Sequence, residues 1–169
     1  MTATHSSVPI CFFVQSFALP DEEVHDPYQV CSSLYEPSVC GDCKAVYVEG
    51  RWQWTTSPVN AHRIRCPACR RIHDKLAAGH VSIEGRFARE YRDELRLLAQ
   101  TLETRMKLQH PMQRIMSIEE QPDGLLITTT DVHLARSIGE ALNRAYKGNL
   151  DFHYNETKYL LRVRWQRWA

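Results

Sequence analysis

Four cysteines in two pairs are the residues of this chain whose type and spacing predict chemistry. Cys40 and Cys43 form one Cys-x-x-Cys pair, Cys66 and Cys69 form the other, and residues 44–65 separate them. A Cys-x-x-Cys turn lets two thiolates reach one metal ion, and two such turns complete the tetrahedral sulfur shell that suits zinc. We therefore predict one structural Zn²⁺, with no open coordination position at which water could be activated.

Two other interpretations of these cysteines fit less well. A secreted disulfide framework normally comes with a signal peptide and a denser set of cysteines. The apolar stretch Val8–Leu19 is short and no Lys or Arg precedes it, so a secretory signal is not expected. A thioredoxin-like motif has one Cys-x-x-Cys beside a βαβ unit, whereas this region has two and few helix signals. Cys11 and Cys31 lack partners at ligand spacing and are expected to be free thiols. Thiolates kept for metal favour a reducing, cytoplasmic setting.

Charge is distributed unevenly along a chain whose net charge is only +1. Residues 1–37 hold five acidic side chains and no Lys or Arg, whereas residues 38–76 hold seven basic and three acidic side chains. Such asymmetry indicates a surface that faces a polyanion. Part of the basic excess could instead stabilise the metal centre, because a zinc–tetrathiolate core is itself negative.

Three segments are predicted, and the middle one carries the cysteines. We predict that residues 1–24 form a poorly ordered leader, residues 25–80 a zinc ribbon and residues 81–169 an α+β domain. In the ribbon, residues 45–48 and 52–54 alternate as two strands around a turn at Gly50. Trp52 and Trp54 point to one face of their strand. They are expected to pack against the rest of the domain, with base stacking as the alternative.

The α+β segment is predicted to follow the order αββαββ, with helices packed on an antiparallel sheet. A short strand is also predicted over Val81–Ile83. Apolar residues at three- and four-residue steps predict a long helix over Gly85–Gln109, which Pro111 ends. Asp131 is expected to cap a second helix that ends near Gly148. The four strands after the long helix are predicted at residues 113–119, 125–130, 150–154 and 159–166.

Two places outside the ribbon are candidate binding sites. Thr129, Thr130 and Arg136 flank the start of the second predicted helix, where backbone N–H groups could hold a phosphate. The competing interpretation is that the threonines suit a strand and Asp131 merely caps the helix, where its carboxylate would repel an anion. The other place is a cationic edge whose basic residues alternate with tryptophans and could contact RNA. Its candidate residues are Arg162, Arg164 and Arg167; the alternative is an edge strand kept soluble by charge.

Several segments resemble a family of small, uncharacterised bacterial zinc-ribbon proteins. That family in turn resembles the N-terminal region of the archaeal and eukaryotic export and maturation adaptor for the large ribosomal subunit, the nonsense-mediated-decay protein 3 type. The resemblance implies zinc held by the four cysteines and contact with ribosomal RNA. The adaptor has further knuckles and domains that this chain lacks, so its export activity is not implied. The segments are GRWQW at 50–54, CPACRRIHD at 66–74, HPMQRIM at 110–116, ITTTDVHLARSIGEALNRAYKG at 127–148 and LDFHY at 150–154.

The sequence therefore predicts a non-catalytic, cytoplasmic zinc-ribbon protein that binds RNA or the ribosome. No Gly-rich phosphate loop, nucleophile elbow or His-Glu-x-x-His motif is present. A protein–protein adaptor that docks through Trp52, Trp54 and the apolar leader is the alternative, and an enzyme acting on a phosphorylated substrate is the third class. The candidate RNA-binding residues of the ribbon are Arg51, Trp52, Trp54, Arg63, Arg65, Arg70 and Arg71.

Overall fold

The computed structural model describes Asp26, Tyr28 and residues 34–169. The predictions made for residues 1–24, for Cys11 and for Cys31 lie outside these residues. Within the described part of the chain, no helix combines the length and apolar character needed to cross a membrane.

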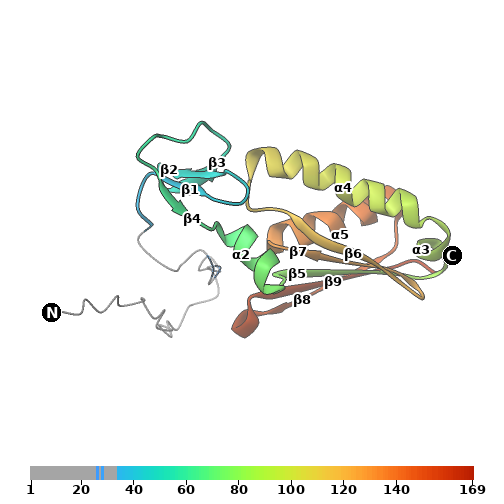
Figure 1. Cartoon of the computed structure of the whole chain (residues 1–169). Helices are drawn as coiled ribbons and strands as arrows, with labels where there is room; N and C mark the ends of the chain where they lie inside the picture. Colours follow the sequence, from blue (N-terminus) through green and yellow to red (C-terminus); the bar gives the residue numbers. More distant parts are fainter. Residues whose placement is uncertain (1–25, 27, 29–33) are drawn as a thin grey trace.

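The first unit is a small four-stranded sheet, ordered β3-β2-β1-β4, followed by one helix that lies between it and the larger sheet (Figure 1). β2 and β3 form the expected hairpin, and Glu49 and Gly50 make its turn with φ of 54° and 74°. The second cysteine pair opens a helix that sequence analysis did not predict. Pro67 suits the first helical position, because the N–H that proline lacks would have no partner there. The elements are β1 (Ser38–Cys40), β2 (Val46–Val48), β3 (Arg51–Gln53), β4 (His62–Ile64) and α2 (Pro67–Asp74).

The second unit is a five-stranded sheet, ordered β6-β7-β5-β9-β8, with helices on one face. The fold class is confirmed: a four-cysteine cluster precedes an α+β unit whose sheet is mainly antiparallel. The elements are β5 (Gly79–Glu84), α3 (Arg86–Glu90), α4 (Arg92–Gln109), β6 (Ile115–Gln121), β7 (Gly124–Thr129), α5 (Val132–Tyr146), β8 (Asn149–Asn155), the 3-10 turn η1 (Glu156–Lys158) and β9 (Leu160–Gln166).

Three details differ from the sequence-based expectation. The single long helix is two helices, because Tyr91 leaves helical geometry at φ −116° and ψ 32°. The short strand at Val81–Ile83 is a full central strand, β5, and it pairs in parallel with β9. The charged strand β9 lies between β5 and β8, so it is not an edge strand.

The helices cover one face of the large sheet and bury its apolar side chains. Along β5 and β9, alternate residues such as Val81, Ile83, Val163 and Trp165 are fully or almost fully buried against these helices. A strand with one buried face alternates in this way because successive side chains point to opposite sides. Alanines and leucines of α4 and α5 complete this core. The opposite face of the sheet carries mainly polar side chains, with Leu126 among them.

Candidate metal centre

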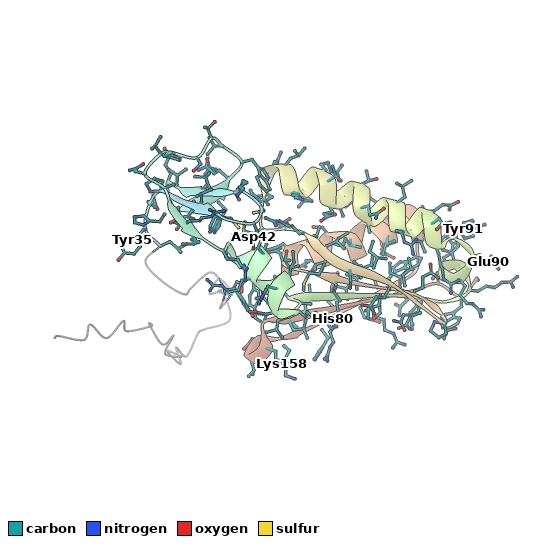
Figure 2. All side chains as sticks on the ribbon, viewed as in Figure 1. Tyr35, Asp42, His80, Glu90, Tyr91 and Lys158 are labelled. Carbon is teal, nitrogen blue, oxygen red and sulfur yellow. The ribbon has the colours of Figure 1, made fainter. Side chains whose placement is uncertain are left out.

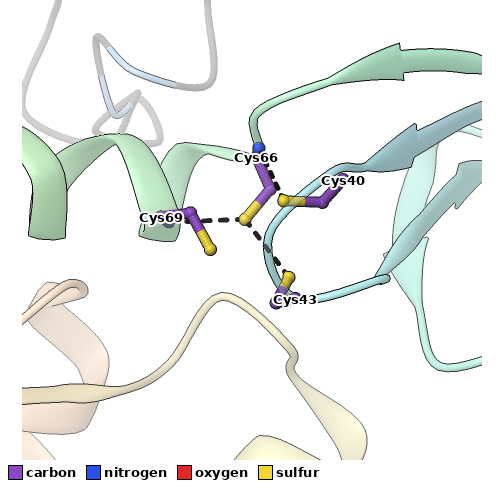
Figure 3. A group of neighbouring side chains, drawn as sticks. All are labelled: Cys40, Cys43, Cys66 and Cys69. Carbon is purple, nitrogen blue, oxygen red and sulfur yellow. Dashed lines mark hydrogen bonds between the residues drawn. The ribbon is translucent and has the colours of Figure 1, made fainter.

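The four cysteines of the two pairs converge on one point between the small sheet and α2 (Figure 3). All four Sγ atoms lie within 4.8 Å of one another, and all four are free thiols. Four sulfurs bound tetrahedrally at a Zn–S distance of about 2.3 Å would be about 3.8 Å apart. The Sγ atoms of Cys43 and Cys66 are 3.7 Å apart, so these residues fit a single tetrahedral ion.

Strand pairing and a helix cap bring the two pairs together. β1 and β4 run in parallel with Cys40 opposite Ile64, so the chain leaves both strands beside the same point. Cys66 is the N-cap of α2, and its Sγ accepts a hydrogen bond from the Cys69 amide at 3.4 Å. The Cys66 amide donates to Cys40 Sγ at 3.3 Å. These amides orient the sulfurs and stabilise negative charge on them.

Arg114, from the segment before β6, lies against the cysteine cluster, and sequence analysis missed it. Its Nη2 donates to Cys43 Sγ at 3.0 Å and its Nη1 donates to Cys69 Sγ at 3.2 Å, while Nη2 lies 3.8 Å from Cys66 Sγ. Its Nε donates to the Pro111 carbonyl at 2.8 Å, and the side chain is buried. No spacing rule could have found it, because it lies in a different unit from the cysteines.

Hydrogen bonds and charge within the cluster favour the thiolate form of Cys43, which is the least buried of the four cysteines. A hydrogen bond with Cys66 and the charge of Arg114 lower the pKa of Cys43 to about 4. The same bond with Cys43, together with burial, raises the pKa of Cys66. Burial by itself would lower the pKa of Arg114, but its bonds to Cys43 and the charges of Cys43 and Cys66 outweigh this and raise it. Arg114 is therefore a fixed cation beside sulfurs that carry negative charge.

The segment that carries Arg114 also joins the two units through apolar and aromatic contacts. Met112 is 9% exposed and belongs to the small apolar cluster formed by the cysteines. Trp54 Nε1 donates to the Lys107 carbonyl at 2.7 Å, and the Arg114 guanidinium lies 5.7 Å from the Trp54 ring centroid. Trp52 is partly buried against the same cluster. Both tryptophans therefore contribute to packing, and Trp54 in particular lies at the junction.

Three of the candidate ribbon arginines are exposed without an acidic partner. Arg51, Arg63 and Arg70 form no ion pair with any residue that the structure describes. Arg65 is also exposed, but its Nε lies 2.8 Å from the Asp42 carboxylate. These side chains remain candidates for contact with phosphate.

Arg71 has to be removed from the candidate RNA surface. Its side chain is 3% exposed and forms a buried ion pair with Asp26. Its Nη1 donates to the Leu76 carbonyl, and its guanidinium lies 4.2 Å from the Tyr28 ring centroid. A guanidinium with these partners is a structural link between α2 and the residues that precede β1.

The arginines near the end of the chain have separate environments. Arg164 is exposed but donates two hydrogen bonds to the Glu84 carboxylate. Arg167 donates to the Tyr146 carbonyl and lies over the Phe87 ring, 4.4 Å from its centroid. Arg162 is exposed and has no ion pair with a described residue. Of the three, Arg162 alone keeps an unengaged charge within the described structure.

The candidate phosphate site at the start of α5 is not assembled. Thr129 and Thr130 are buried and their hydroxyls donate to the backbone carbonyls of Asp131 and Met112. The Asp131 carboxylate accepts the amides of the first turn, His133 and Leu134, at 2.8 and 3.1 Å. Arg136 pairs with Glu140 on the exposed side of the helix. The capping interpretation is therefore the correct one.

Comparisons of the chain with protein-family models, with curated proteins and with solved structures find no match. The family resemblance noted in the sequence therefore stays a prediction.

Proposed function

We propose that the four cysteines bind one structural Zn²⁺ and that the protein acts without catalysis, by binding RNA or the ribosome in the cytoplasm. The observation that supports this proposal most directly is the closed four-sulfur cluster. Four thiolates at tetrahedral spacing suit zinc and leave no coordination position for a substrate. Bound zinc would hold the two cysteine turns together, and the second turn lies between β4 and α2, which display Arg63 and Arg70.

The exposed cations of the ribbon support the choice of RNA as partner. Arg51, Arg63 and Arg70 face solvent without acidic partners among the described residues. Arginine suits phosphate recognition because its planar guanidinium presents several N–H donors in a fixed geometry. Because Trp52 and Trp54 are partly buried, we expect pairing of arginines with phosphates to contribute most of the RNA affinity, and base stacking to contribute little.

A salt titration tests this proposal. The affinity of the zinc-loaded protein for labelled RNA and for purified ribosomes should fall linearly with salt on logarithmic axes, because bound phosphates release counterions. The double variant R51Q/R63Q should weaken binding and flatten this slope. A flat salt response of the unaltered protein would contradict the proposal.

The adaptor alternative keeps one specific observation in its favour. A hollow of about 460 Å³ opens between α4 and α5, and its lining combines apolar side chains such as Leu97, Leu98 and Ala141 with the charged side chains of Glu94 and Arg105. Leu97 is 64% exposed, so its side chain is accessible to a partner. A protein partner whose capture survives nuclease and high salt, and is lost in Leu97→Glu, would favour the adaptor over RNA binding.

A further inference from the structure

The outer side of α4 carries apolar side chains that nothing in the described part of the chain covers. Figure 1 shows α4 along one edge of the molecule, with α5 and the large sheet on its inner side. Leu108 of this helix is 71% exposed, Leu97 is exposed as well, and Tyr91, which immediately precedes the helix, is 40% exposed. Figure 2 places Tyr91 at the end of α4 that joins α3. Exposed apolar side chains that gather along one helix indicate a contact surface, whereas single ones are ordinary.

Exposed and half-exposed residues form a continuous stripe along this side of α4. Their positions alternate in steps of three and four, so they lie on one face of the helix. This is the spacing of the a and d positions in a heptad repeat, through which two helices pack along each other. The buried residues Leu95, Ala99 and Leu102 lie on a different face and belong to the core. The residues of this surface, which we call the α4 stripe, are Tyr91, Glu94, Leu98, Thr101, Arg105 and Leu108.

The stripe contains one acid and one base, and neither has a partner among the described residues. Glu94 and Arg105 are exposed, both line the hollow between α4 and α5, and their side chains form no ion pair with a described residue. Other charges of α4 are engaged, since Arg96 pairs with Glu120 and Glu103 accepts a hydrogen bond from the Ile115 amide. At 1.5 Å per residue, Glu94 and Arg105 lie about 16 Å apart along the helix axis. The stripe therefore offers a negative and a positive charge at two separate points.

The order of residues in the α4 stripe is self-complementary. When two copies of α4 lie antiparallel about a twofold axis at their middle, Glu94 of each copy lies opposite Arg105 of the other. The same register places Tyr91 opposite Leu108 and Leu98 opposite Thr101. The apolar side chains supply the buried area, and the two ion pairs set the register. A parallel arrangement is disfavoured, because it brings like charges together at both points.

We propose that the α4 stripe is the interface of a homodimer, in which two copies of this chain pack their α4 helices antiparallel. A second copy is the partner that this surface fits, because each charge of the stripe then faces an opposite charge. The inference does not depend on the proposed function. The ribbon arginines and the four cysteines lie outside the stripe, and the test needs no RNA.

Charge reversal followed by mixing tests this arrangement. In analytical ultracentrifugation, the mass of the zinc-loaded protein should rise with concentration from the 19.6 kDa of one chain toward twice that value. Glu94→Arg and Arg105→Glu should each stay monomeric where the unaltered protein is dimeric, because each variant places like charges opposite each other at both points. An equimolar mixture of the two variants should form dimers again, since each variant supplies the charge that the other requires.

Asp93→Arg is the matched control, because Asp93 shares the first turn of α4 with Glu94 but lies off the stripe. This variant should dimerise as the unaltered protein does. An unaltered protein that is monomeric at every concentration would overturn the inference and leave the hollow to a different partner. A dimer that persists in both charge reversals and in Leu108→Glu would use another surface. Monomeric single variants that do not associate when mixed would refute the antiparallel pairing.

Discussion

Arg114 and Cys43 are 71 residues apart in the chain, yet the guanidinium Nη2 of one lies 3.0 Å from the sulfur of the other. This contact joins the α+β unit to the metal centre. A zinc ion with four thiolates carries a net charge of about −2, so an arginine that donates to the sulfurs stabilises the loaded state.

Replacing Arg114 by Met should weaken zinc binding. Loss of a group that hydrogen-bonds metal ligands typically lowers metal affinity by about 10- to 100-fold. The zinc affinity of Arg114→Lys should lie between those of Arg114→Met and the unaltered protein. Lysine keeps the charge but lacks the planar guanidinium that donates from two nitrogens to two sulfurs. Competition with a chromogenic chelator measures the affinity. Arg65→Gln, also near the ribbon cysteines but bonded to Asp42, is the matched control and should bind zinc normally. Unchanged affinity in Arg114→Met would show that the contact does not stabilise the metal.

Metal removal should unfold the ribbon before the α+β unit. The apolar cluster around the cysteines is small, and the cysteines themselves form half of its buried members. Such a cluster depends on its metal, whereas the larger cluster between the sheet and α5 has its own apolar core. Hydrogen exchange after chelation should show fast exchange in β1, β2 and α2 and continued protection in β5, β7 and β9. Simultaneous loss of protection in both units would contradict this expectation.

Breaking the buried pair between Arg71 and Asp26 should be strongly destabilising. Removing one partner leaves a buried charge without compensation, which typically costs about 3–5 kcal/mol. Both Arg71→Met and Asp26→Leu should therefore lower the free energy of unfolding measured in urea. The double variant D26L/R71M should recover much of that loss, because neither charge remains. Purely additive losses would indicate that the two side chains do not interact.

Substitutions of Asp131 should separate its role as a helix cap from the effect of its charge. Asp131→Ala loses both hydrogen bonds to the first turn of α5 and should cost about 1 kcal/mol. Asp131→Asn keeps an acceptor oxygen and should cost less.

Burial raises the pKa of the Asp131 carboxyl, so the folded state favours its protonated form. This preference adds to the free energy of unfolding at low pH, and the added stability is lost as pH rises through the raised pKa. The stability of Asp131→Asn relative to the unaltered protein should therefore increase over the same pH range, as urea unfolding at several pH values would show.

The four-cysteine cluster could be predicted from the sequence because each half of it depends on local spacing. A Cys-x-x-Cys turn brings two sulfurs together whatever surrounds it, so Cys40, Cys43, Cys66 and Cys69 could be named without a fold. The cap at Asp131 and the buried alternation in β9 were also predictable, because each is set by neighbours within a few residues. Local patterns of this kind also determined the α+β class.

The environment of each arginine was decided by tertiary structure alone. Nothing in the sequence distinguishes buried Arg71 from exposed Arg70 beside it, and no spacing links Arg114 to the cysteines. Strand order likewise placed β9 in the interior of the sheet and aligned Arg162 with His80 and His153. Sequence periodicity fixes which side of a strand a residue faces, but pairing between distant segments fixes its neighbours. The physical reason is that the charge of an arginine acts through the groups around it, and long-range contacts select those groups.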